Sequence, residues 1–72
     1  MHDVLAPVDG IVTTVAVDEG QLIGEEDEVA RLRSGDQEVI VITEVPGVVR
    51  ELYAQPGSQV RSGDVLAAID EA

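Results

Sequence analysis

Hydrophobic and polar residues alternate over short stretches of this chain, and glycine separates the stretches. Two stretches begin at Gly10 and Gly47. Each carries three apolar positions, and the spacing of these positions is the same in both stretches. These positions are Val12, Val15 and Val17 in the first stretch and Val49, Leu52 and Ala54 in the second. The first step is odd and the second is even, so a regular strand cannot place all three side chains on one face. We therefore predict two strands, each with a bulge or a corner, near residues 13–14 and near residues 50–51.

The two stretches belong to a longer internal repeat. A shift of 37 residues, from Gly10 to Gly47, superimposes the two halves without a gap. Matched pairs further along are Gly20 with Gly57, Ile23 with Val60, Asp27 with Asp64, Val29 with Leu66 and Leu32 with Ile69. One position differs, because Glu26 stands where the second half has Gly63. Two equivalent halves predict a pseudo-two-fold domain that interlocks around one core, with Gly20 and Gly57 in turns at positive φ.

The rest of the pattern predicts short strands and no helix. Strands are expected at residues 28–33 and 65–69, and apolar runs on both sides of Ser34-Gly35-Asp36-Gln37 indicate a hairpin. A periodicity of 3.6 residues fails in every window of useful length, and glycine or proline interrupts most of them. The prediction is a single all-β domain over residues 1–72.

Composition sets limits on what such a domain can do. With 72 residues, of which 44% are hydrophobic, the chain can bury a core but is too short for a deep catalytic cleft. It has no Phe, no Trp and one Tyr, so small aliphatic side chains must fill the core. Cysteine is absent, which excludes disulfides and thiolate metal sites. No nucleophile–base arrangement or phosphate-binding glycine loop is visible, so we predict that the chain is not an enzyme.

The net charge of −11 narrows the choice of partners. Fifteen acidic residues face four basic ones, all arginines (Arg31, Arg33, Arg50 and Arg61). Nucleic acid and anionic membranes would be repelled, so neither is an expected partner. No apolar run could span a membrane and no secretory signal is visible, so a cytoplasmic location is expected. The excess of acidic residues fits either a surface for a basic partner or adaptation of the protein to high internal salt. We favour adaptation to salt, because the acidic residues are spread along the chain and lysine is missing.

Several motifs, all in register, resemble those of biotinyl and lipoyl attachment domains. Ala6-Pro7-Val8-Asp9-Gly10 resembles the Ala-Pro-x-x-Gly motif of that family. Gly57-x-x-Val60-x-x-Gly63-Asp64-x-Leu66-x-x-Ile69 matches its Gly-x-x-Val-x-x-Gly-Asp-x-Leu-x-x-Ile signature, and a similar run extends from Gly20 to Leu32. The resemblance covers residues 4–69. It implies a barrel-sandwich hybrid, which is a flattened β-barrel of two quasi-symmetric halves.

In that family a lysine on the hairpin between the halves carries biotin or lipoate. Counted by the family's spacing from either Gly20 or Gly47, the position of this lysine is Asp36. The family's Ala-Met-Lys-Met or Thr-Asp-Lys-Ala becomes Ser34-Gly35-Asp36-Gln37. Both cofactors are attached through an amide to a lysine ε-amine, and this chain contains no lysine. The resemblance therefore implies an acceptor position without its lysine and no cofactor, while Gly35 and Asp36 also suit an ordinary turn.

Other candidate sites have ordinary explanations. Glu25-Glu26-Asp27-Glu28 offers carboxylates to Ca²⁺, but it lacks the spacing of a calcium loop and is expected to be a solvated loop. His2 has no partner ligand for a metal and is expected in a frayed terminus. Tyr53 is expected to face outward, as a contact anchor or as a partly covered surface residue. Surface ion pairs are expected among Arg31, Arg33 and nearby acids such as Glu38.

Three functions fit these observations. The leading hypothesis is a lysine-less module that binds a protein partner or acts as a scaffold, with a biotin- or lipoate-dependent enzyme as the candidate partner. The second is a degenerate carrier subunit of such an enzyme complex. The third is a structural homo-oligomer that forms through an exposed strand edge.

Overall fold

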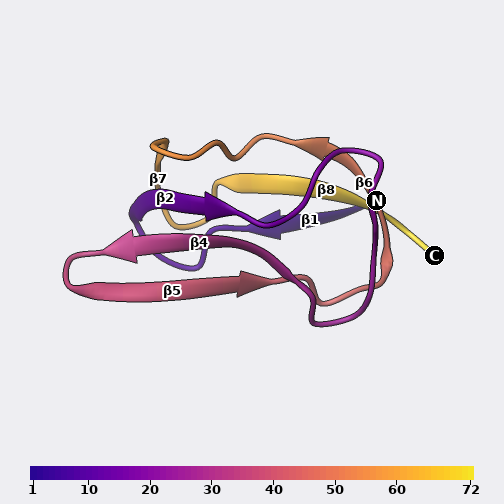
Figure 1. The fold of residues 1–72 in the computed structure, drawn as a ribbon, viewed down its shortest axis with the longest axis horizontal. Helices are drawn as coiled ribbons and strands as arrows, with labels where there is room; N and C mark the ends of the chain where they lie inside the picture. Colours follow the sequence, from indigo (N-terminus) through magenta and orange to yellow (C-terminus); the bar gives the residue numbers. More distant parts are fainter.

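The computed structural model describes residues 1–72, and its regular structure consists of strands alone. Two antiparallel four-stranded sheets, in the orders β1-β8-β6-β3 and β5-β4-β2-β7, face each other (Figure 1). The strands are β1 (His2–Leu5), β2 (Gly10–Val15), β3 (Leu22–Ile23), β4 (Glu28–Ser34), β5 (Gln37–Ile42), β6 (Gly47–Leu52), β7 (Gln59–Val60) and β8 (Val65–Glu71). This arrangement confirms the predicted all-β barrel-sandwich hybrid. No helix suited by length and apolarity to cross a membrane is present.

The internal repeat is also a symmetry of the fold. In the sheet orders, β1, β8, β6 and β3 occupy the places that β5, β4, β2 and β7 occupy in the other sheet. The backbone N–H of Gly20 donates to the carbonyl of Val49 at 2.7 Å, and that of Gly57 donates to Val12 at 2.7 Å. Each half is therefore tied to the first long strand of the other half, as the predicted interlocking requires. Gly20 and Gly57 have φ of +86° and +91°, so the predicted turns are confirmed.

Both predicted bulges are present. The pairing of β2 with β4 shifts register between Val12 and Thr14, and the pairing of β6 with β8 shifts between Val49 and Glu51. The extra residue changes which face the following side chains occupy. Val12 and Val17 can thus both be buried although they lie an odd number of residues apart.

Glycine begins β2 and β6 because the neighbouring backbone leaves no room for a side chain. A Cβ atom on Gly10 would lie 2.6 Å from the carbonyl oxygen of Arg33, at the end of β4. A Cβ atom on Gly47 would overlap the carbonyl oxygen of Asp70, at the equivalent place on β8. Close packing at Gly10 therefore fixes where the end of β4 lies.

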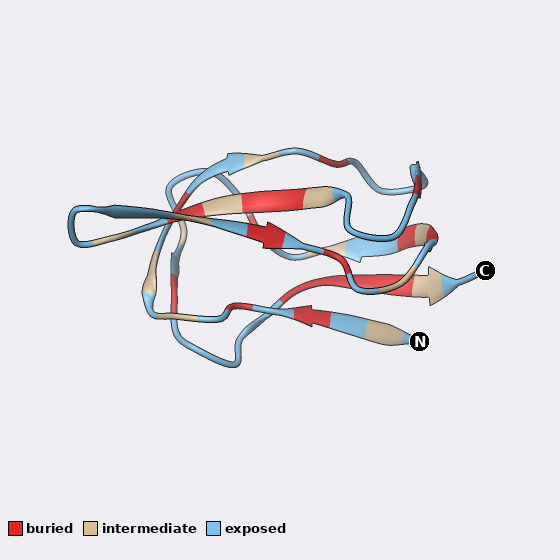
Figure 2. Cartoon of the chain, turned by 90° about the horizontal axis from the view of Figure 1, so that it is seen from below, coloured by how far each residue is buried: buried red, intermediate tan, exposed pale blue.

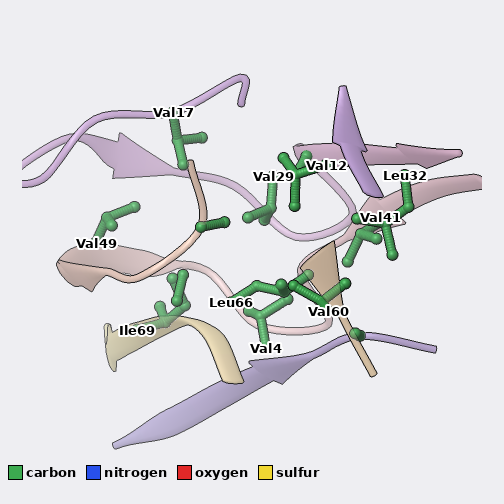
Figure 3. Close-up of a cluster of buried hydrophobic side chains, with 14 of the residues drawn as sticks. Val4, Val12, Val17, Val29, Leu32, Val41, Val49, Val60, Leu66 and Ile69 are labelled. Atoms are coloured by element: carbon green, nitrogen blue, oxygen red, sulfur yellow. The ribbon is translucent and has the colours of Figure 1, made fainter. Parts of the chain in front are cut away.

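The core lies between the two sheets and consists of small aliphatic side chains (Figure 3). Its largest fully buried side chains include Leu32, Leu66 and Ile69. Figure 2 shows buried stretches between exposed ones along the chain, and β8 contains the longest buried run, from Leu66 to Ile69. Thr43 is the one buried polar residue, and its hydroxyl donates to the carbonyl of Val45 at 2.7 Å. No buried side-chain nitrogen or oxygen lacks a hydrogen-bond partner.

The sequence pattern missed β1, β3 and β7. Two of these strands contain only two residues, too few to show an alternation. The third places His2 in β1, where it pairs with Ile69, so the expectation of a frayed terminus at His2 is wrong. Pairing with β8 orders this end of the chain.

Candidate functional site: the tip of the β4–β5 hairpin

The β4–β5 hairpin projects from the end of the molecule opposite to the two chain termini (Figure 1). Ser34 pairs with Gln37, which leaves Gly35 and Asp36 as a two-residue turn. Gly35 has a φ of +60°, and Asp36 is not among the residues with positive φ. This combination is that of a type II′ hairpin turn, in which glycine takes the first central position. The turn thus explains Gly35 and leaves Asp36 free to vary in side chain.

The side chains of the turn point into solvent. Gly35, Asp36 and Gln37 are exposed, and Ser34 is half-buried. A Cβ atom added to Gly35 would meet no other atom within 4 Å, so the tip has open space around it. The position that the family resemblance assigns to the acceptor is therefore accessible to a partner protein.

Two arginines nearly neutralise the hairpin. Arg31 donates to both carboxylate oxygens of Glu28 at 3.0 Å and to Glu38 at 3.3 Å. The hydrogen bond and the charge of Glu28, with the charge of Glu38, raise the pKa of the Arg31 guanidinium. From Glu28 to Ile42 the hairpin carries three acidic residues and two arginines, in a chain with a net charge of −11. The strong acidity of the protein therefore lies outside this hairpin.

Arg33 differs from the expectation of an ion pair. Its Nε donates to the carbonyl oxygen of Gly35 at 3.3 Å, and Arg31 alone is paired with Glu38. The guanidinium of Arg33 folds along its own strand and contacts the turn. Sequence reasoning missed this contact because the spacing of Arg33 and Glu38 across the hairpin suits an ion pair equally well.

The other candidates do not join the hairpin tip. Glu25, Glu26 and Asp27 form an exposed loop, as predicted, and the Asp27 carboxylate accepts from the backbone N–H of Gly24 at 2.7 Å. For Glu28 the prediction of a solvated loop is wrong, because Glu28 begins β4, is half-buried and pairs with Arg31. No group of three or more His, Asp or Glu side chains is arranged to hold a metal ion. Tyr53 faces outward, as predicted, and is 55% exposed. The hydrogen bond from its hydroxyl to the Glu51 carboxylate, together with partial desolvation, raises the pKa of Tyr53.

The chemistry of the tip does not fit an attached biotin or lipoate. Ser34, Asp36 and Gln37 offer a hydroxyl, a carboxylate and an amide, and none of these is a nucleophilic amine. The hairpin geometry of a carrier domain is present without the side chain that forms the amide bond.

Two facing sheets, built from two equivalent halves and joined by an exposed hairpin, define a carrier-type β domain. No family model matches the sequence. The biotinylated protein TB7.3 homologue of Mycobacterium leprae is 34% identical over 68 residues, which cover 94% of this chain and 96% of the relative. The chain belongs to the biotinyl/lipoyl attachment domain family.

Solved structures support the same fold. The lipoyl domain of the 2-oxoglutarate dehydrogenase complex from Azotobacter vinelandii superimposes with a TM-score of 0.81 at 25% identity, over 99% of this chain and 98% of that domain. The urea carboxylase of Kluyveromyces lactis superimposes with a TM-score of 0.88 at 20% identity, over 96% of this chain. This chain spans only 6% of the urea carboxylase, so that comparison concerns the fold of one domain.

Proposed function

We propose that this domain is a biotinyl/lipoyl-like module that carries no covalently attached group and acts by binding a protein partner, as a docking or scaffold domain. The observation that carries the proposal is Asp36, which occupies the exposed turn where the family has its acceptor lysine. A carboxylate cannot form the amide to biotin or lipoate, and no lysine exists elsewhere in the chain. In this proposal the domain has no catalytic activity of its own.

The proposed partner is a biotin- or lipoate-dependent enzyme that docks on the hairpin end. Structural neighbours of the domain are parts of carboxylases and of a dehydrogenase complex, which supports an enzyme partner. The near-neutral hairpin also supports docking there, because a partner would meet little of the charge that repels acidic proteins from the rest of the surface. Exposed Asp36 and Gln37 would be the first side chains to make contact.

The intact mass of the protein purified from its source tests whether it carries a group. We expect the mass of the unmodified polypeptide, to which these 72 residues contribute 7.6 kDa. An added biotinyl or lipoyl mass would overturn the proposal. It would favour the second candidate, a carrier subunit, which the similarity to a biotinylated protein TB7.3 homologue of M. leprae also supports.

A single substitution tests whether the tip lacks only the amine. We expect the Asp36→Lys variant to be modified by a biotin or lipoate protein ligase, because the turn is exposed and already adopts a hairpin geometry. The control is Glu38→Lys, which introduces the same charge change two residues from the turn and should stay unmodified. If Asp36→Lys fails, replacing the whole tip by Ala-Met-Lys-Met shows whether Ser34, Gly35 and Gln37 have also lost recognition. Failure of both variants would refute our assignment of the acceptor position.

Competition tests whether the hairpin end of the wild-type protein docks on an enzyme that recognises this fold, with the ligase as the probe. Excess wild-type protein should slow ligase-catalysed modification of the Asp36→Lys variant, because the two proteins share every surface except one side chain. A chain with Gly35→Pro, which removes the backbone conformation of the turn, should compete less well. Equal rates with and without wild-type protein would contradict docking through the hairpin.

A further inference from the structure

Strand β5 (Gln37–Ile42) has no hydrogen-bonded strand on one side of its backbone. It lies at the edge of the sheet β5-β4-β2-β7, whereas the edge strands β3 and β7 are only two residues long. In Figure 1 it forms the outer side of the molecule along the hairpin. An exposed strand of this length can pair with a strand of another chain.

The hydrogen bonds beside β5 identify which of its residues face the open side. Just after β5, the Thr43 N–H donates to Asp27 at 3.0 Å and the Thr43 carbonyl accepts from Glu26 at 2.8 Å, both on the β4 side. Because backbone direction alternates along a strand, Val39 and Val41 also face β4. Glu38, Ile40 and Ile42 then point their N–H and C=O groups to the open side, and Ile40 and Ile42 are 51% and 45% exposed.

The equivalent edge in the other sheet carries a charge at the matching position. Strand β1 occupies the place of β5, and Asp3 corresponds to Ile40 in the repeat. Asp3 pairs with Ala68 on β8, as Ile40 pairs with Arg31 on β4. A charged residue on an edge strand discourages pairing with another chain. The chain thus has a carboxylate at the centre of its shorter edge and an isoleucine at the matching position of its longer edge.

We propose that the β5 edges of two copies of this chain pair antiparallel about a two-fold axis at Ile40. This register places Ile40 opposite Ile40 and Glu38 opposite Ile42, so the three edge-facing residues supply both sides of the pairing. A second copy is the occupant that fits, because the edge complements itself. The dimer would contain one continuous sheet, in the order β7-β2-β4-β5-β5-β4-β2-β7.

The charges permit this register. Glu38 of one copy lies opposite Ile42 of the other copy, and Ile42 is four residues from the Glu38 of that same copy. The two Glu38 carboxylates therefore lie about 14 Å apart along the strands. That separation exceeds the Debye length of about 8 Å at physiological ionic strength. Each Glu38 also lies 3.3 Å from Arg31 of its own hairpin. The hairpins run in opposite directions, so the turn of each copy lies beside the chain that follows β5 in the other copy, at the level of Glu44.

The pairing is weak and strengthens with salt. One strand pair buries less than the roughly 1,200 Å² of a stable interface. Two chains of net charge −11 also repel each other at a distance. Salt shortens the Debye length from about 10 Å at 0.1 M to about 3 Å at 1 M and removes that repulsion.

Analytical ultracentrifugation from micromolar to millimolar protein, in low salt and in molar KCl, tests the proposal. We expect the average mass to rise from 7.6 kDa toward twice that value, with stronger association in KCl. Ile40→Asp copies the residue of the β1 edge and places two carboxylates opposite each other, so it should weaken association at least about tenfold. The control is Leu22→Asp on β3, which removes a 74% exposed side chain and should leave association unchanged.

Amide hydrogen exchange of the wild-type chain provides a test that needs no variant. The amides of Glu38, Ile40 and Ile42 should exchange more slowly in concentrated samples in KCl, while those of Val39 and Val41 are protected at every concentration. Three results would overturn the proposal: a mass of one chain under all conditions, association of Ile40→Asp equal to wild type, or exchange at these three amides that is independent of concentration.

Discussion

Replacement of Glu26 by glycine should stabilise the protein. Glu26 is the only non-glycine residue with positive φ, at +69°, and the repeat places it where the second half has Gly63 at +93°. The two turns are otherwise alike, because the N–H of Glu26 donates to Thr43 and that of Gly63 donates to Ala6, both at 2.8 Å. A left-handed conformation costs an L-residue about 1–2 kcal/mol. Glycine loses about 0.5–1 kcal/mol more backbone entropy on folding. We therefore expect Glu26→Gly to raise the free energy of unfolding by about 0.5–1 kcal/mol, or the melting temperature by about 2–8 °C.

Urea unfolding followed by circular dichroism measures this change. Glu26→Gln serves as the control, because it removes the charge from the acidic loop and keeps a side chain at positive φ. The reciprocal variant Gly63→Glu should be destabilised by a similar amount, since a Cβ atom at Gly63 would meet nothing within 4 Å and only the backbone conformation opposes it. The reasoning is refuted if Glu26→Gly is no more stable than wild type, or if Glu26→Gln reproduces the whole gain.

Three further predictions concern other parts of the molecule. Gly47→Ala should destabilise the fold by about 1–3 kcal/mol, since its Cβ atom would overlap the Asp70 carbonyl; chemical denaturation would reveal this, and an unchanged midpoint would contradict it. Only three of the fifteen acidic side chains are paired with an arginine, so the melting temperature should rise from low salt to molar KCl, and equal melting at both would refute the high-salt hypothesis. The hydrogen bond to Glu51 raises the pKa of Tyr53, so Glu51→Gln should lower that pKa toward 10.0 in a spectroscopic titration. The raised pKa means that folding favours the neutral phenol of Tyr53. Any contribution of Tyr53 to stability is therefore present below pH 10 and is lost as the pH rises through the raised pKa. Glu51→Gln should diminish this loss.

The sequence predicted those features of the fold that repeat. The bulges followed from an odd step between apolar positions, and the hairpin followed from a Gly-Asp pair between two apolar runs. The strand β1 was not predictable in this way, because its burial pattern depends on pairing with β8, which lies more than sixty residues away in the chain. The contact between Arg33 and the Gly35 carbonyl was missed for a related reason. Arg33 has two partners within reach, Glu38 and the Gly35 carbonyl, and the local geometry of the turn decides between them.

The departures from the repeat carry more information about this particular protein than the repeat does. The hydrogen bond from Gly20 to Val49 and the one from Gly57 to Val12 are equivalent in the two halves. The residues that form such bonds therefore follow the same sequence pattern in both halves. Positions that differ between the halves are free of this requirement. Asp3 and Ile40 differ at the two equivalent sheet edges, and the turn at Asp36 has no counterpart in the other half, where the chain termini lie. The two surfaces proposed for interaction, the hairpin tip and the β5 edge, therefore both fall where the symmetry of the scaffold is broken.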